Sequence, residues 1–215
     1  MCGRFAQYTP AKVYHELLGL DTSRPCGEII PRWNIAPGAC CWTVTNGESE
    51  PQFYSYTWGY APAWATKMVN KPINARSETV DTLPVFRAGF RTGRVLIPAN
   101  GWYEWKKLAA GKRPYYHRLA GAAPFFFGGI ADSQTFAILT APANECAAEI
   151  HDRMPVIIRP ADYRAWLAPG AKLGDLREMM QPLAAEAIEV YPVSIAVNKA
   201  GSEGSNLIER EEKPS

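Results

Sequence analysis

The pattern of apolar and polar positions predicts a short helix near the start of the chain and an irregular segment after it. Apolar residues stand at helical spacing at Val13, Tyr14, Leu17 and Leu18. Pro10 suits the first turn of this helix, and Gly19 suits the position just after its end. Residues 21–38 are rich in Pro, Gly and Arg, which predicts a loop.

The middle of the chain has the pattern of short β-strands. Residues 41–45 and 52–58 are β-rich and flank Asn46-Gly47, a strong hairpin signal. Further β-rich segments, each bounded by Gly, Pro or Asn, are 94–98, 102–106, 115–119, 125–130 and 136–140. We therefore expect a mostly β core.

Helical patterns border this β region and do not alternate with its strands. They cover residues 144–150, 161–167 and 175–180, and a last strand is expected at 188–193. This order predicts an α+β fold with a mainly antiparallel, barrel-like sheet and peripheral helices. We expect one domain over residues 2–198 and a flexible polar tail over 199–215.

Composition limits the class of protein. A chain of 215 residues with a net charge of +2 has room for a large core and gives no overall argument for nucleic acid. No apolar run of about 18 residues is present, which predicts a soluble protein. The 5 cysteines lack the paired spacing of a zinc site and the density of a secreted scaffold. We expect a cytoplasmic protein without metal or cofactor.

Charge is concentrated in residues 86–118. The segment contains a single acid, Glu104, and many cations interleaved with aromatic residues: Arg87, Arg91, Arg94, Lys106, Lys107, Lys112, Arg113 and Arg118. Cations and flat rings suit single-stranded nucleic acid, because phosphates attract charge and unstacked bases need partners. A solvated strand pair whose rings face the core explains the same composition, and both interpretations stay open.

Cys2 is the most reactive candidate. Removal of Met1 would leave an amine and a thiol on adjacent carbons, a 1,2-aminothiol. Such a pair attacks either an acyl carbon, with the amine as base, or an aldehyde, first as an imine and then as a five-membered thiazolidine. Position alone is weak evidence, because Cys2 could also be an incidental residue at a frayed end.

Three polar segments in apolar surroundings supply further candidates. Glu104 lies between Tyr103 and Trp105, and an apolar pocket there would raise its pKa and suit it to proton transfer. His151 follows a predicted helix and could be catalytic or merely structural. Asn74 and Arg76 combine an amide that can hold an amine with a cation that can clamp a phosphate.

Taken together, these segments resemble the SRAP family of SOS response-associated peptidases, or abasic-site processing proteins. The resemblance runs from Cys2 to about Asn198 and rests on separated motifs in the family's order: residues 1–5, 31–37, 58–59, 74–79, 96–99, 101–105 and 151–155. It implies that Cys2, exposed by removal of Met1, forms a thiazolidine with the aldehyde of an abasic site in single-stranded DNA and shields the lesion. A minor strand-cleaving lyase activity is implied as a side reaction.

The resemblance also implies roles for single residues. Asn74 would orient the amine of Cys2, Glu104 would move protons, and His151 would stabilise the opened sugar. The residues expected at the DNA are Arg4, Asn34, Pro37, Trp58, Trp64, Arg76, Arg87, Arg91 and Trp102. We expect a monomer that works in the cytoplasm, at the nucleoid when DNA is damaged. The alternative function is an N-terminal-nucleophile peptidase or amidohydrolase that releases its own Met1.

Overall fold

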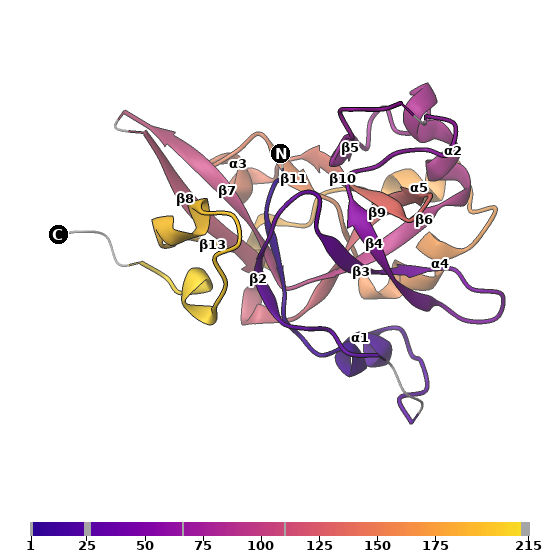
Figure 1. The fold of residues 1–215 in the computed structure, drawn as a ribbon, viewed down its shortest axis with the longest axis horizontal. Helices are drawn as coiled ribbons and strands as arrows, with labels where there is room; N and C mark the ends of the chain where they lie inside the picture. Colours follow the sequence, from indigo (N-terminus) through magenta and orange to yellow (C-terminus); the bar gives the residue numbers. More distant parts are fainter. Residues whose placement is uncertain (1, 24–26, 66, 110, 212–215) are drawn as a thin grey trace.

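Two β-sheets form the centre of the molecule, and helices lie around them (Figure 1). The computed structural model describes residues 2–23, 27–65, 67–109 and 111–211. Most strand pairings are antiparallel, and the helices are short and peripheral. This architecture confirms the predicted α+β fold class.

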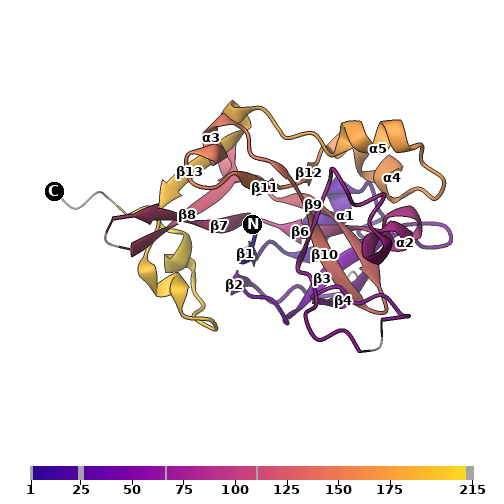
Figure 2. The same ribbon diagram turned by 90° about the horizontal axis from the view of Figure 1, so that it is seen from above.

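The smaller sheet has five strands in the order β13-β8-β7-β1-β2, all antiparallel. These strands are β1 (Phe5–Gln7), β2 (Arg32–Ile35), β7 (Gly101–Leu108), β8 (Gly111–Leu119) and β13 (Ile188–Pro192). β7 and β8 form a long hairpin that projects from the rest of the molecule (Figures 1 and 2). β1 pairs only with the first residues of β7, through Phe5 and Ala6. From Glu104 onward, that edge of β7 has no neighbouring strand among the described residues.

The larger sheet follows the order β11-β10-β4-β3-β6-β9-β12, and β5 pairs with β10. Its strands are β3 (Cys40–Thr45), β4 (Gln52–Trp58), β5 (Asn74–Arg76), β6 (Arg94–Ala99), β9 (Phe125–Asp132), β10 (Thr135–Pro142), β11 (Arg153–Pro155) and β12 (Ile157–Ile158). β10 also pairs with β9, so the sheet curls toward a barrel. The barrel-like sheet is not fully closed, because β10 and β4 share only the pairs Thr135 with Thr57 and Phe136 with Trp58.

The helices pack mainly against the larger sheet. They are α1 (Ala11–Leu17), α2 (Pro84–Thr92), α3 (Glu145–Ala148), α4 (Tyr163–Leu167) and α5 (Leu173–Met179). Tyr14 of α1, Phe90 of α2 and Trp166 of α4 share one buried cluster with Phe126 of β9. None of the described helices is long and apolar enough to span a membrane.

A second buried cluster joins the two sheets. Phe5 and Trp102 from the smaller sheet meet Ile97 and Phe127 from the larger one, and Cys2 belongs to the same cluster. The rings of Phe5 and Phe127 contact edge to face, with centroids 5.9 Å apart. The start of the chain is therefore fixed between the sheets by apolar packing.

The chain passes from the larger sheet to the smaller one at Asn100 and Gly101, between β6 and β7. Asn100 is buried, and its side-chain oxygen accepts hydrogen bonds from the backbone N–H groups of Tyr8 (2.8 Å) and Thr9 (3.2 Å). A Cβ at Gly101 would overlap the carbonyl oxygen of His117, so only glycine fits. This corner fixes where β7 begins.

Several elements differ from the prediction, and the short strands β1, β5, β11 and β12 were not predicted. β2 lies inside residues 21–38, which were predicted as loop, because its pairing with β1 stabilises an extended conformation that local composition does not favour. α2 was not predicted at all. Its apolar residues Phe86 and Phe90 have helical spacing, but the cations between them obscured the pattern. The predicted turn Asn46-Gly47 lies in a longer connection, since Thr45 pairs with Gln52.

The segment 199–211 packs on the smaller sheet, which disagrees with the predicted flexible tail from residue 199. Leu207 is buried beside Tyr191, whose hydroxyl donates to the carbonyl oxygen of Ile208 (3.0 Å). The buried Leu207 contributes apolar packing to this polar segment. The polar composition of the segment gave no sign of this packing. Residues 212–215 of the predicted tail, and Met1, lie outside the described residues.

Replacement of Gly101 tests the corner. We expect Gly101→Ala to lower the free energy of unfolding by about 1–3 kcal/mol or more, because the new methyl group overlaps the backbone of β8. Gly174→Ala is the matched control, since a Cβ there meets nothing within 4 Å and the residue lies in α5. Urea unfolding measures both, and equal stability of the two variants would contradict the role of the corner.

Candidate functional site

A cleft of about 460 Å³ lies beside the open edge of β7. Its lining residues come from the β7–β8 hairpin, from the segment before β11 and from the 3-10 turn Ile195–Asn198. They are Glu104, Trp105, Lys107, Lys112, His151 and Asn198. Glu104 and His151, predicted from separate motifs, thus meet at one cleft. Cys2 and Asn74 do not line this cleft. Asn74 binds the backbone of Cys2, and the carboxylate of Glu104 lies near enough to Cys2 to raise the pKa of its thiol.

Cys2 belongs to the buried cluster between the two sheets, with 0% of its surface exposed. Its thiol contacts the carbonyl oxygen of Arg4 at 3.8 Å. Burial raises the pKa of the Cys2 thiol far above its ordinary value, and the nearby carboxylate of Glu104 raises it further. Burial therefore holds the sulfur as a thiol at neutral pH.

Asn74 holds the backbone of Cys2. β5 places Asn74 beside Ile138 of β10, and the Asn74 amide donates to the carbonyl oxygen of Cys2 at 2.9 Å. The side-chain oxygen of Asn74 is buried and has no hydrogen-bond partner among the described residues. A buried amide oxygen without a partner is unfavourable. It is an acceptor available to a donor at Cys2.

Glu104 is 4% exposed, although it lines the cleft. It lies on β7 opposite Tyr115 of β8, three residues after the corner at Gly101. Burial raises the pKa of Glu104 to about 7, and the charge of Asp152 adds to this effect. The carboxyl group is therefore present in both protonation states near neutrality, which suits a general acid and base.

His151 lies at the other side of the cleft, two residues before β11. Its Nδ1 lies 3.0 Å from the backbone nitrogen of Arg153 and 2.8 Å from the carboxylate of Asp152. Burial lowers the pKa of His151, and the charge of Lys107 also lowers it, while Asp152 opposes both. A neutral ring accepts the Arg153 N–H at Nδ1 and so presents a protonated Nε2, whereas a charged ring donates to Asp152.

An ion pair between Arg153 and Glu78 links the segments that follow His151 and Asn74. Arg153 of β11 contacts both carboxylate oxygens of Glu78, one of them at 2.8 Å, and donates to the carbonyl oxygen of Thr140 at 2.6 Å. The pair lowers the pKa of Glu78 to about 2. Because Thr140 belongs to β10, which pairs with β5 and β11, this contact fixes both strands to one scaffold.

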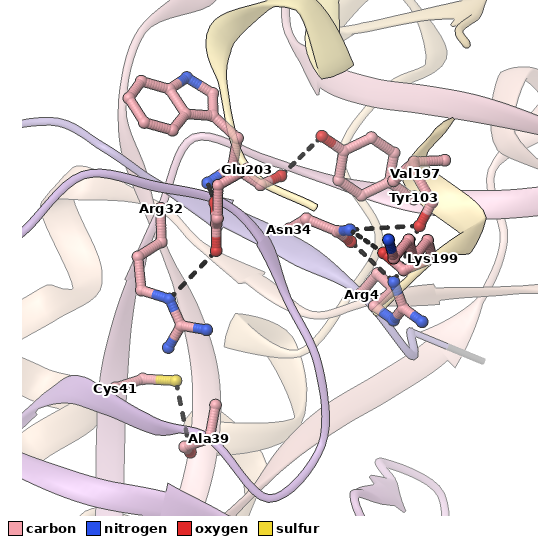
Figure 3. Close-up of polar contacts among 10 residues, drawn as sticks. Arg4, Arg32, Asn34, Ala39, Cys41, Tyr103, Val197, Lys199 and Glu203 are labelled. Atoms are coloured by element: carbon pink, nitrogen blue, oxygen red, sulfur yellow. Dashed lines mark hydrogen bonds and ion pairs between the residues drawn. The ribbon is translucent and has the colours of Figure 1, made fainter. Parts of the chain in front are cut away.

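Arg4 and Asn34 hold the last part of the chain near the cleft (Figure 3). Arg4 donates to the side-chain oxygen of Asn34 (2.8 Å) and to the carbonyl oxygen of Val197 (2.9 Å). The Asn34 amide donates to the carbonyl oxygens of Val197 and Lys199, each at 3.2 Å. Asn34 is buried, so in this structure it supports the wall beside Asn198 and has no polar atom free for solvent.

The predicted aromatic contacts divide into buried and exposed ones. Trp58 packs on Phe5, and Trp102 stacks on His117 with centroids 4.8 Å apart; both indoles are buried and offer no face to a base. Trp64 is 64% exposed, and Pro37 is exposed as well. The structure therefore leaves Trp64 as the predicted tryptophan that could stack on DNA.

The predicted cations also occupy different places. Arg76 is exposed at the end of β5, two residues after Asn74. Arg87 and Arg91 are exposed on α2, and Arg91 lines a separate hollow of about 390 Å³. That hollow shares no lining residue with the cleft of Glu104 and His151. Arg76 is thus linked to the candidate site, while the structure does not bring Arg87 and Arg91 to the cleft.

Comparison with known proteins identifies the family. Residues 1–200 match the model of the SOS response associated peptidase family, SRAP. This chain belongs to the SRAP family. The abasic site processing protein YoqW of Bacillus subtilis is 35% identical over 97% of this chain and 99% of its own, and YedK of Escherichia coli, also named an abasic site processing protein, is 33% identical over 97% and 99%. A crystal structure of a Bacteroides thetaiotaomicron protein has the same fold, with a TM-score of 0.86 at 21% identity, covering 98% of this chain and 100% of its own.

Sequence reasoning missed several residues of this SRAP cleft. Lys107 and Lys112 were noticed only as part of a basic segment, although their places near the turn of one hairpin were a usable signal. Asn198 gave no signal, because the packing of the last part of the chain brings it to the cleft. Its side-chain oxygen accepts the indole N–H of Trp105 at 2.7 Å.

The described part of this SRAP chain contains no cluster of three or more His, Cys, Asp or Glu residues that could hold a metal ion. The side chains at the cleft combine an acid, an imidazole, an amide and two ammonium groups. This set suits proton transfer and the binding of an anionic ligand.

The raised pKa of Glu104 predicts a pH-dependent stability. Between about 4.5 and about 7 the folded state holds a proton that the unfolded state has lost, so stability falls as pH rises. Glu104→Gln cannot titrate and so does not lose stability in this way. As pH rises from about 4.5 to about 7, the free energy of unfolding of Glu104→Gln minus that of the parent chain should increase by up to about 3 kcal/mol. Urea unfolding at several pH values measures the difference. Glu16→Gln, an exposed site on α1, is the control, and a pH-independent difference for Glu104→Gln would contradict the buried acid.

Proposed function

We propose that this protein processes abasic sites in single-stranded DNA by covalent capture through Cys2. The observation that carries the proposal is that Glu104 and His151 line one cleft, and that Cys2, whose carbonyl oxygen accepts from Asn74, lies near enough to Glu104 for that carboxylate to raise the pKa of the thiol. The family relatives named abasic site processing proteins support the same substrate. Removal of Met1 is the activating step, because it turns the backbone amide of Cys2 into an amine.

The amine reacts first. An abasic sugar in its open form carries an aldehyde at C1′, and the α-amine of Cys2 attacks this carbon and releases water, giving an imine. The thiol is a poor first nucleophile here, because burial keeps it protonated. Asn74 already holds the carbonyl of Cys2, and its unpartnered oxygen accepts a hydrogen bond from the new amine. This contact points the nitrogen lone pair toward the aldehyde.

The thiol then closes the ring. The sulfur forms a bond to C1′, the C=N double bond becomes a single bond, and the thiol proton ends on the nitrogen. Glu104 accepts the proton from sulfur and returns it to nitrogen, which its pKa of about 7 allows in both directions. His151 presents its Nε2–H to the O4′ hydroxyl that ring opening of the sugar leaves behind. Ring closure removes the imine and so suppresses strand cleavage by β-elimination.

The surroundings of the cleft suit a single strand. Arg76 supplies a cation next to Asn74, and Trp64 supplies an exposed ring for a base next to the lesion. Arg4 keeps the wall in place and has further N–H groups for a phosphate. Trp58 and Trp102 contribute as the packed floor. We propose that one chain is sufficient for capture.

A denaturing gel and an intact-mass measurement test this function. Protein with a free Cys2 amine is mixed with a single-stranded oligonucleotide that contains one abasic site. We expect a heat-stable adduct whose mass equals the sum of protein and DNA less one water, because imine formation loses water and ring closure loses nothing. No adduct, or hydrolysis of a peptide or glutamine without reaction with DNA, would overturn the proposal.

Two cysteine variants control the same experiment. Cys2→Ala should lose the heat-stable adduct and retain only an imine that borohydride can trap. Cys40→Ala removes an exposed thiol from β3 and should react like the parent chain. A tag left before Cys2 should abolish the ring, because it leaves no free α-amine.

A further inference from the structure

Two lysines face each other across the β7–β8 hairpin without a compensating acid. Lys107 of β7 lies directly opposite Lys112 of β8. Like charges at opposed positions of a strand pair repel each other and destabilise the hairpin. No carboxylate among the described residues forms an ion pair with either ammonium group. The hairpin therefore holds two opposed positive charges that an external anion can compensate.

The neighbouring cationic pair of the same hairpin is different. Lys106 lies opposite Arg113, and Arg113 has the carboxylate of Glu211 at 3.7 Å. Lys107 and Lys112 line the cleft of Glu104 and His151, whereas Lys106 and Arg113 do not. The hairpin thus carries one cationic pair, Lys106 and Arg113, that Glu211 neutralises in part. The second pair, Lys107 and Lys112, has no ion-pair partner among the described residues.

The open pair lines the reaction cleft. Lys107 and Lys112 border the same 460 Å³ cavity as Glu104 and His151. Lys107 is near enough to His151 to disfavour its charged form. A sugar at Glu104 and His151 would consequently have its neighbouring backbone phosphate within the reach of the lysines. The wall on the other side is held by the hydrogen bond from Trp105 to Asn198.

We propose that Lys107 and Lys112 form a phosphate subsite for the DNA backbone next to the abasic sugar. The subsite rests on the proposed function, and it assigns the β7–β8 hairpin the task of positioning the strand. Two ammonium groups at one phosphate neutralise its charge and relieve their own repulsion. The ligand is the phosphodiester, so the contribution to affinity is independent of base sequence.

Binding of lesion-free single-stranded DNA tests the subsite first. Lys107→Gln with Lys112→Gln should weaken binding about tenfold near 0.1 M salt and make the salt dependence less steep by about 0.7 for each phosphate that the variant no longer neutralises. The matched control, Lys106→Gln with Arg113→Gln, removes the same charge from the same hairpin and should change affinity less than threefold. Fluorescence anisotropy over a salt series measures both double variants, and equal weakening of the two would overturn the subsite.

A neutral phosphate then locates the subsite on the strand. Single methylphosphonate groups are placed, one at a time, on the 5′ and 3′ sides of an abasic site. For the parent chain one position should weaken binding, and for Lys107→Gln with Lys112→Gln the same substitution should have little further effect. Additive losses at every position would contradict the assignment.

The outcomes separate this inference from the proposed function. If the parent chain forms no adduct but the lysine pair alone controls DNA affinity, the subsite stands and covalent capture fails. If the adduct forms and both double variants bind alike, covalent capture stands and the subsite fails.

Discussion

The passage of the chain from one sheet to the other at Asn100 and Gly101 is the constraint on which the site depends. The buried Asn100 side chain binds the backbone that follows β1, and Gly101 lets β8 approach too closely for any side chain. β7 must then start beside β1, where Phe5 pairs with Trp102. Three residues after Gly101, β7 no longer pairs with β1, and Glu104 lies at the open edge beside the cleft. This corner thus fixes where β7 passes from the buried Trp102 to Glu104 at the cleft.

Burial between the two sheets gives Cys2 and Glu104 their chemistry. The same apolar surroundings keep the thiol protonated and raise the pKa of Glu104 to about 7. The carboxylate of Glu104 raises the pKa of the Cys2 thiol further, so the thiol holds its proton to a higher pH than it would in water. A thiol that keeps its proton leaves the first attack to an amine, and an acid near neutrality can then carry that proton from sulfur to nitrogen. The order of the proposed steps follows from electrostatics.

Local sequence signals predicted the longer strands and singled out four candidates, Cys2, Asn74, Glu104 and His151, because alternation and isolated polar groups in apolar motifs are visible without a structure. They failed where a distant partner decides the conformation. β2 is extended because β1 lies beside it, and Leu207 anchors a polar segment because Tyr191 is there to receive it. Trp58 and Trp102 look like base-stacking residues in the sequence, yet both belong to the core. Asn198 lies at the cleft because Arg4 and Asn34 bind the carbonyl oxygen of the preceding Val197 and Trp105 binds its side chain.

Three unfavourable features of the free protein lie within this small region. Glu104 is an acid without the solvation it would have in water, the side-chain oxygen of Asn74 lacks a partner among the described residues, and Lys107 opposes Lys112. Elsewhere the chain satisfies such groups: Arg94, equally buried, donates to the carbonyl oxygens of Phe90, Trp166 and Ala168. The unpartnered oxygen of Asn74 and the opposed lysines lower the stability of the empty protein, and a ligand that supplies a donor and an anion compensates them. Under the proposed function, the amine of Cys2 supplies the donor that the Asn74 oxygen lacks, and the DNA backbone supplies the anion that Lys107 and Lys112 lack.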